Sequence, residues 1–266
     1  MSQSYRQKYA FEQPGQPADA RYDALAALYD ESTQRHLAAR GLAPGWRCLD
    51  VGAGGGSIAR WMSEQVGPSG HVLATDLNTN SLERVRAPNL EVRQHDIVRD
   101  SLPDGAFDLI HTRLVLVHIP ERDDVLDKLI AALKPGGWLV TEEFDAQSML
   151  PDPSLNPAET EPVLMLALQQ VLRQHGADTR FGRLMAARFR ALGLRDIEAE
   201  GRLILIKGGS TWAGIHRTNA QLVRAEIIES GIMTEESFER ELARLDDPDF
   251  AAPSAIMWTA WGQRPS

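Results

Sequence analysis

The chain has 266 residues and a formal net charge of −9, and 43% of its residues are hydrophobic. It is therefore long enough for one large domain with a sizeable core, whereas two full domains are not expected. The acidic balance argues against nucleic acid as a partner, because proteins bind DNA and RNA largely through clustered Lys and Arg.

Membrane-spanning and disulfide-rich classes are also disfavoured. No apolar run reaches the roughly 18 residues that a membrane-spanning helix needs, and the polar N-terminus lacks the apolar region of a signal peptide. The single cysteine, Cys48, excludes an internal disulfide and a cysteine-clustered zinc site. We therefore expect a cytoplasmic protein with no membrane partner and no metal site.

Residues 1–44 are predicted to form an N-terminal arm and a helical cap ahead of the main domain, which spans 45–266. The first 20 residues are polar, whereas leucines and the tyrosines Tyr22 and Tyr29 then recur at helical spacing. The tyrosines have two interpretations: they close over a bound cofactor, or they are half-buried packing residues.

Between residues 45 and 144, apolar runs alternate with helical patterns, which predicts βαβ units and a parallel sheet. The expected strands are 47–51, 71–75, 90–94, 107–112 and 138–144. The helix before the last of these strands is expected to end at Lys134, where Pro135, Gly136 and Gly137 break it.

Beyond residue 144 the pattern is looser. Residues 145–162 contain four prolines and are predicted to be a loop. Helices are expected near 164–172, at 183–192 and through 211–246, with a sixth strand at 200–207 and a seventh at 255–262. Helical insertions at about 146–181 and 211–250 are suitable material for a lid over a substrate pocket.

The segment LDVGAGGGSIARWM joins the first strand to a helix through a glycine-rich turn. Gly52, Gly54 and Gly56 allow the backbone to adopt conformations barred to other residues and to approach a ligand closely. Ser57 opens the helix, whose N-terminal amides face an anionic group. Asp76 ends the second strand, where a carboxylate can accept both hydroxyls of a ribose. Together these features predict a nucleoside-containing cofactor.

The spacing disfavours a nicotinamide dinucleotide, since G-x-G-x-x-G begun at Gly52 would need a glycine where Ser57 stands. The pattern present is D-x-G-x-G-x-G from Asp50. It resembles motif I of the class I S-adenosylmethionine-dependent methyltransferases. The segments LATDLN, RQHDIV, FDLIHTR and LKPGGWLV continue the resemblance, which covers roughly 45–145 well and the C-terminal part in outline. Asp50 replaces the commoner Glu, which keeps the charge but shortens its reach.

This resemblance implies an α/β fold: a Rossmann-like, doubly wound sheet of seven strands, mostly parallel. The final strand at 255–262 is expected to run antiparallel between strands five and six. The cofactor implied is S-adenosyl-L-methionine. In family members the residues matching Asp76 and Leu77 lie at the ribose and beside the adenine, and those matching Asp96 and Ile97 receive the adenine amino group and support the ring.

Thr112 and Arg113 lie near the methionine end of the cofactor in the same resemblance. Arg113 has a second interpretation, a structural salt bridge, because both kinds of ion pair use the same guanidinium geometry. The complete predicted cofactor set is Asp50, Gly52, Ala53, Gly54, Gly56, Ser57, Asp76, Leu77, Asp96, Ile97, Thr112 and Arg113.

Methyl transfer from a sulfonium is an in-line displacement, so most of the catalysis is holding the nucleophile about 3 Å from the methyl carbon. A base is needed only if the acceptor is a phenol or an alcohol. The candidate catalytic residues are His118, Glu142 and Glu143, at the ends of strands four and five. Alternation sends the two glutamates to opposite faces, and each candidate has a structural alternative, a packed or capping histidine or an ion-pair partner.

Two further groups have open interpretations. His111 lies within strand four and is expected in the core. Three tryptophans either line an aromatic acceptor pocket or pack the lid and the last strand: Trp212, Trp258 and Trp261.

We therefore expect an enzyme that methylates an oxygen, nitrogen or carbon atom of a small molecule, with specialised metabolism as one setting. Two alternatives remain open: a protein of this fold that binds the cofactor but catalyses another reaction, such as a cyclisation, or a non-catalytic binding protein. A nicotinamide dehydrogenase is the least favoured. A homodimer is compatible with the sequence, and the acceptor's identity lies beyond it.

Overall fold

The computed structural model describes residues 19–149 and 163–266. Most of the predicted arm and of the proline-rich loop lies outside these ranges. The main sheet has seven strands in the order β3-β2-β1-β4-β5-β9-β6. Their bounds are β1 Arg47–Val51, β2 His71–Asp76, β3 Leu90–Gln94, β4 Phe107–Arg113, β5 Leu133–Asp145, β6 Arg195–Arg202 and β9 Ile256–Gln263.

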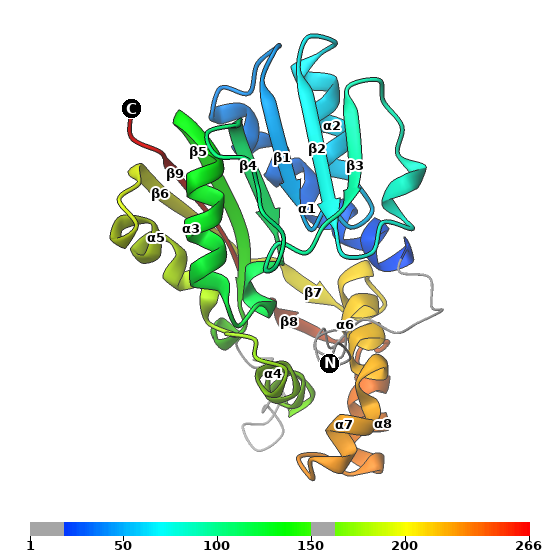
Figure 1. Cartoon of the computed structure of the whole chain (residues 1–266). Coiled ribbons are helices and arrows are strands. Elements are labelled where there is room, and N and C mark those ends of the chain that lie inside the picture. Colours follow the sequence, from blue (N-terminus) through cyan, green and yellow to red (C-terminus); the bar gives the residue numbers. More distant parts are fainter. Residues whose placement is uncertain (1–18, 150–162) are drawn as a thin grey trace, which may run out of the picture.

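The sheet confirms the predicted Rossmann-like fold. Strands β1 to β5 pair in parallel, and β9 runs antiparallel between β5 and β6. Helices cover both faces, with α3 and α5 on one and α1 and α2 on the other (Figure 1). The bounds of these helices are α1 Asp19–Ala39, α2 Ser57–Val66, α3 Arg122–Ala132 and α5 Phe181–Ala191.

The segments predicted to form a lid, called the lid below, lie beyond the carboxyl ends of the parallel strands (Figure 1). Its elements are α4 Val163–Gln174, α6 Thr211–Leu222, α7 Arg224–Glu229, α8 Glu235–Arg244 and the paired strands β7 Leu205–Lys207 and β8 Ala251–Pro253. It has a core of its own, in which Trp212, Ile227 and Phe238 are buried, and Leu25 and Leu28 of α1 pack against that core. The N-terminal cap therefore bridges the sheet and the lid.

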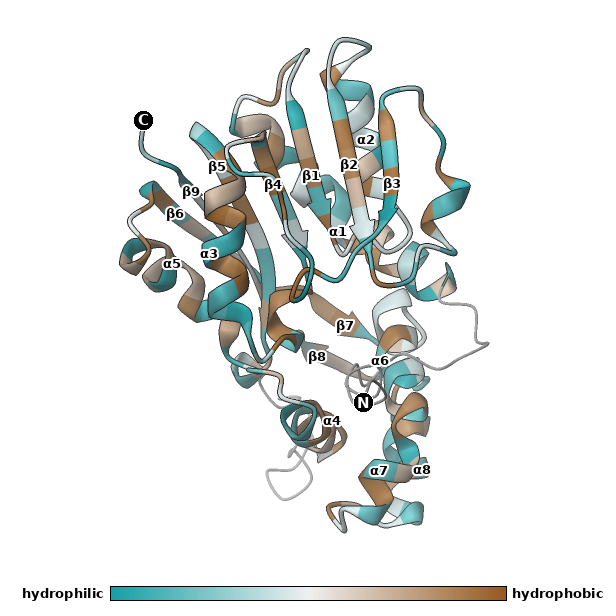
Figure 2. Cartoon of the chain, in the orientation of Figure 1, coloured by the Kyte–Doolittle hydropathy of each residue, from teal (hydrophilic) through white to brown (hydrophobic). Residues whose placement is uncertain are grey.

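The hydropathy of the residues follows the layered arrangement of the sheet and its covering helices. The central strands are mostly brown in Figure 2, whereas the helices show teal on their outer faces. This pattern is expected for a parallel sheet covered on both sides, since its strands are buried on both faces. Within 19–149 and 163–266, no helix combines the length and the apolar character required to span a bilayer.

The predicted sixth strand at 200–207 is wrong in its bounds. The structure divides this stretch between β6, which begins earlier at Arg195, and β7, which belongs to the lid sheet. The reason is that β6 is an edge strand with mostly exposed side chains, so it lacks the apolar run that marks a buried strand. The apolar run belongs to β7, where Ile206 is buried in the lid core.

The predicted end of the third helix at Lys134 is also displaced. Helix α3 ends at Ala132 and β5 begins at Leu133, so Pro135 and Gly136 lie inside the strand. They occupy an irregular stretch where the register between β4 and β5 shifts. The turn residues therefore make a bulge rather than a loop, as is common near strand ends.

Three short 3-10 helices complete the described chain: η1 Leu82–Arg84, η2 Leu116–His118 and η3 Ala146–Ser148. The second of these, η2, begins shortly after β4 ends. It lies at the carboxyl ends of the parallel strands, where the lid joins the sheet.

Candidate functional site

The candidate site lies where the strand order reverses. The chain runs outward from β1 through β2 to β3 and then returns to β4 on the other side of β1. In open α/β sheets, ligands bind outside the carboxyl ends of the strands at such a switch point. The glycine-rich turn after β1 and the turn after β4 meet at this point.

The glycine-rich turn requires glycine at several positions. Gly52, Gly54 and Gly56 have φ angles of 66°, 56° and 78°, in the region that side chains disfavour. A Cβ at Gly52 would lie 2.3 Å from Cγ2 of Val115, and one at Gly54 would lie 2.9 Å from the ring of Tyr22. The side chains of Val115 and Tyr22 therefore cover Gly52 and Gly54, so only glycine fits this turn, and α2 begins at Ser57 as predicted.

Asp76 is held against this turn by backbone amides. Its Oδ2 accepts a hydrogen bond from the amide of Gly54 at 2.9 Å, and its Oδ1 accepts one from the amide of Asn78 at 3.1 Å. Burial raises the pKa of this carboxyl, although the amide hydrogen bonds oppose the shift. An ionised carboxylate has about four acceptor positions, so two remain for a ligand's hydroxyls.

Leu77 and Asp96 lie on the same edge. The side chain of Leu77 is 55% exposed, so a flat apolar ring can cover it. The amide of His95 donates to the carbonyl of Asp76 at 2.9 Å, which brings the ends of β2 and β3 together. Asp96 follows at once and accepts from the amide of Val98 at 3.0 Å, while Ile97 is buried beneath. The two acids therefore follow neighbouring strand ends, as the sequence predicted.

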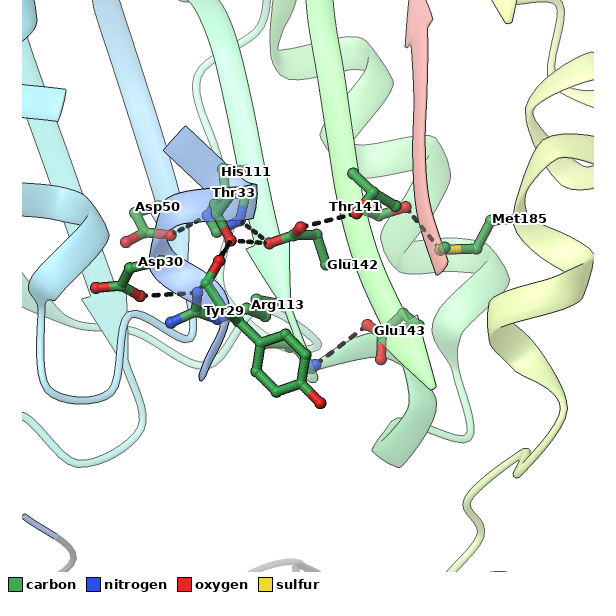
Figure 3. Close-up of polar contacts among 12 residues, drawn as sticks. Tyr29, Asp30, Thr33, Asp50, His111, Arg113, Thr141, Glu142, Glu143 and Met185 are labelled. Carbon is green, nitrogen blue, oxygen red and sulfur yellow. Dashed lines mark hydrogen bonds and ion pairs between the residues drawn. The ribbon is translucent and has the colours of Figure 1, made fainter. Parts of the chain in front are cut away.

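A buried ionic cluster lies under the turn (Figure 3). His111 of β4 donates from Nδ1 to Oδ1 of Asp50 at 2.7 Å and from Nε2 to Oε2 of Glu142 at 3.3 Å, and all three side chains are almost fully buried. Burial alone would lower the pKa of His111, but the two carboxylates raise it to about 9. Burial likewise opposes ionisation of Glu142, yet His111 and its other partners lower its pKa to about 2.

The same cluster connects to the cap helix. Oε2 of Glu142 accepts from the hydroxyl of Thr33 at 2.5 Å, and Oε1 accepts from Thr259 at 2.8 Å. Nη1 of Arg113 donates to Asp30 at 2.9 Å and to Thr33 at 3.0 Å. Arg113 thus forms the salt bridge that was the structural alternative, and its contact with the cofactor stays a prediction. Within the described residues, no group of three or more His, Cys, Asp or Glu is arranged to hold a metal ion.

Glu143 points to the opposite face of β5, as alternation predicts, but it is fully buried. Its Oε1 accepts from the amides of Val115 at 3.1 Å and Leu116 at 2.7 Å, while its Oε2 has no hydrogen-bond partner in the described part of the chain. Burial raises the pKa of Glu143 to about 8, although the amides oppose this. The side chain therefore holds the turn after β4, in which Leu114 has a φ of 57° and Val115 abuts Gly52.

Replacing Glu143 by glutamine tests this description. Folding keeps Glu143 protonated at pH values where the unfolded chain ionises it, so the wild-type free energy of unfolding should fall as pH rises from about 4.5 to 8. The decline should be up to about 1.4 kcal/mol per pH unit, and Glu143→Gln should lack it. Urea unfolding between pH 5 and 8 measures the difference, and parallel profiles for the two proteins would contradict it.

The remaining predicted residues occupy varied surroundings. His118 lies in η2, where burial, together with Arg21 and Arg122, lowers its pKa to about 3, so it would be a weak base. Thr112 is fully buried, and its hydroxyl has no hydrogen-bond partner among the residues that the structure describes. Tyr22 covers Gly54 and Gly55. The three catalytic candidates, His118, Glu142 and Glu143, lie near the carboxyl ends of β4 and β5. Their catalytic role stays a prediction.

A groove of about 480 Å³ lies beside the glycine-rich turn, between α1, α2 and residues 81–87. Ser81 and Arg84 there bind the carboxylate of Asp19, which anchors the first turn of α1. The groove is lined by both acidic and basic side chains and includes Gly55, but it contains none of the predicted cofactor residues. It is therefore not the candidate site.

Comparison with known proteins decides the family. A family model described as a methyltransferase domain matches residues 19–199, more than half of the chain. The chain belongs to the class I S-adenosylmethionine-dependent methyltransferases. The predicted family is thereby confirmed, and S-adenosylmethionine is the cofactor of this family.

Two curated relatives and one solved structure illustrate which proteins this chain is similar to. Methyltransferase str3 of Strobilurus tenacellus is 29% identical over 173 residues, which cover 64% of this chain and 61% of that protein. The ubiquinone/menaquinone biosynthesis C-methyltransferase UbiE of Ectopseudomonas mendocina is 33% identical over 112 residues, 39% of this chain and 44% of that protein. The matches thus span less than two thirds of either relative.

The solved structure is that of the (4+2)-cyclase SpnF. It is 17% identical, covers 89% of this chain and 81% of its own, and has a TM-score of 0.52. At this identity the likeness shows the fold alone. Because a protein described as a cyclase has the same fold, the reaction must be argued from the site and tested directly.

Proposed function

We propose that this protein transfers the methyl group of S-adenosylmethionine to an oxygen, nitrogen or carbon atom of a small-molecule acceptor. The observation that carries the proposal is the glycine-rich turn at the switch point, where Gly52, Gly54 and Gly56 have left-handed φ angles and the amide of Gly54 donates to Asp76. Asp76, fixed against that backbone by two amides, supplies an acceptor for the ribose. Specialised metabolism and a cytoplasmic location belong to the same proposal, and a homodimer stays a prediction.

The described residues fit the cofactor. The glycine-rich turn lies at the switch point, Asp76 retains acceptor positions beside it, and Leu77 exposes an apolar surface on the same edge. The ionic cluster of Asp50, His111 and Glu142 contains two carboxylates and one imidazolium, so it carries one net negative charge close to this edge. That charge favours a cationic ligand over a neutral one.

When bound, S-adenosylmethionine supplies an electrophilic methyl group on a positively charged sulfur. Glu143 holds the turn after β4 against the glycine-rich turn, so the two sides of the site keep one geometry. Positioning of this kind provides most of the rate enhancement in an in-line transfer.

The test uses S-adenosylmethionine labelled in its methyl group, incubated with the protein and a small-molecule extract. We expect the label to enter a small molecule in step with formation of S-adenosylhomocysteine, and we expect Asp76→Ala to abolish both. An acceptor converted without S-adenosylhomocysteine would support the non-methylating alternative and overturn this proposal.

A further inference from the structure

Four rings meet between the cap helix, the end of β5 and the lid. The ring centroids of Tyr29 and Phe144 are 5.9 Å apart, those of Tyr29 and Trp212 are 6.0 Å apart, and those of Phe144 and Trp212 are 5.7 Å apart. His216 lies 4.6 Å from Trp212. We call Tyr29, Phe144, Trp212 and His216 the aromatic junction. Because its rings come from α1, β5 and α6, it joins the sheet edge to the lid.

The aromatic junction contains polar atoms without partners. Tyr29 is 2% exposed and Trp212 is 4% exposed, yet Oη of Tyr29, Nε1 of Trp212 and Nε2 of His216 have no hydrogen-bond partner among residues 19–149 and 163–266. Buried polar atoms are normally bonded, because an unmet donor or acceptor costs free energy. Three such atoms on rings in mutual contact indicate a place where a polar ligand completes the bonding.

The unmet atoms define what that ligand must offer. Nε1 of Trp212 is only a donor, so the ligand needs an acceptor oxygen. Asn219 follows His216 by three residues and thus shares its helix face. Its Oδ1 is buried and has no partner within the described ranges, and as an acceptor it requires a donor such as a hydroxyl. Rings on several sides favour a planar partner that can stack or pack edge to face.

The charges around the aromatic junction favour a neutral ligand. Burial lowers the pKa of His216 to about 4, so its imidazole is uncharged near neutral pH. Of the two neighbouring cations, Arg113 is paired with Asp30, whereas Arg202 lies over the ring of Tyr29 and donates to the neutral carbonyl of Leu28. The ring atoms of the aromatic junction are thus uncharged, so they offer hydrogen bonds and not a counter-ion to a buried carboxylate or phosphate.

The junction also lies beside the predicted methionine end of the cofactor. Tyr29 directly precedes Asp30, whose carboxylate binds Arg113 at the end of β4, and Phe144 directly follows Glu143. We infer that the aromatic junction is the acceptor subsite, and that it takes an uncharged planar aromatic compound bearing a hydroxyl and a carbonyl oxygen. This inference rests on the proposed methyl transfer and specifies its substrate class.

The experiment compares three probes by calorimetry with protein saturated with S-adenosylhomocysteine. The probes are 4-hydroxyacetophenone, which is neutral and planar, 4-hydroxybenzoate, which is anionic, and 1-(4-hydroxycyclohexyl)ethanone, which has no aromatic ring. We expect the first to bind at least tenfold more tightly than the other two. Equal or weaker binding of 4-hydroxyacetophenone would overturn the inference.

Variants locate the binding. Tyr29→Phe and Trp212→Phe each keep a ring but remove one polar atom, so each should weaken 4-hydroxyacetophenone binding about fivefold or more. Trp61→Phe, on α2 and outside the lid core, should not change it. If both junction variants bind the probe as tightly as the wild type, the unmet atoms are a packing feature and the inference fails.

Binding of S-adenosylhomocysteine in the same titrations separates the two proposals. If it binds but the neutral aromatic probe is not preferred, only the substrate class is wrong. If neither S-adenosylhomocysteine nor S-adenosylmethionine binds, the proposed function itself fails, and this inference fails with it.

Discussion

Replacing Asp76 by alanine is expected to weaken S-adenosylmethionine binding by about a hundredfold or more. Removing one partner of a buried, charge-assisted hydrogen bond typically costs about 2–5 kcal/mol, and each 1.4 kcal/mol is about tenfold. The variant also frees the amide of Gly54, which Asp76 holds in the wild type. Isothermal titration measures the affinity, and Asp104→Ala, in an exposed loop, is the matched control.

The pH dependence of the same affinity gives a second readout. Burial raises the pKa of Asp76, so the carboxylate that accepts the ribose hydroxyls is lost as pH falls through this raised value. Wild-type affinity should therefore decline on acidification at a higher pH than an ordinary aspartate would produce. Asp76→Asn should bind weakly and lack this decline, whereas an unchanged affinity in either variant would show that the ribose is held elsewhere.

Replacing His111 by leucine should lower the free energy of unfolding by about 3–5 kcal/mol. Removing one member of a buried ion pair leaves its partners charged and uncompensated, and here both Asp50 and Glu142 would lose their counter-ion. Urea unfolding at pH 6 measures the loss. Arg60→Ala, which removes an exposed pair with Glu64, should change stability by less than about 1 kcal/mol.

The pH profile of that loss has a defined sign. The pKa of His111 is raised to about 9 in the folded state, so its contribution is complete below about 6.5 and is lost as pH rises through 9. The pKa of Glu142 is lowered to about 2, so its contribution is present above about 4.5 and is lost as pH falls through 2. The difference in the free energy of unfolding between the wild type and His111→Leu should be largest between pH 4.5 and 6.5. A difference that does not change with pH would contradict the ionic description.

The elements that could be predicted are those determined by local pattern. Strands β1 and β3 lie where their apolar runs predict, and the turn with Gly52, Gly54 and Gly56 adopts the left-handed backbone that glycine alone tolerates. These features depend on neighbours in sequence, so periodicity and turn chemistry are enough to identify them. Edge strand β6 was misplaced because its exposed side chains carry no such signal.

The ionic cluster could not be predicted, because its members come from distant parts of the chain. Thr33, Asp50, His111, Glu142 and Thr259 lie on α1, β1, β4, β5 and β9, and only the sheet order brings them together. The core position of His111 was expected, but its charge was not. One signal for the cluster was available in the sequence. An acid and a histidine occupy paired positions on two adjacent strands, Asp50 on β1 and His111 on β4.

The two glutamates of β5 show the same limit in another way. Alternation correctly separates Glu142 and Glu143 onto opposite faces, yet it gives neither burial nor partners. The structure shows one carboxyl ionised by its neighbours and the other kept largely protonated by burial. Such differences arise from packing around the end of the strand, where η2 and α1 contribute groups far away in sequence.

The most direct test of the account is a calorimetric titration of the wild-type protein with S-adenosylmethionine, alongside NADH. The glycine-rich turn and Asp76 predict saturable binding of S-adenosylmethionine at one site per chain and no binding of NADH. An absence of heat up to millimolar S-adenosylmethionine, or tighter binding of NADH, would contradict the assignment of this site.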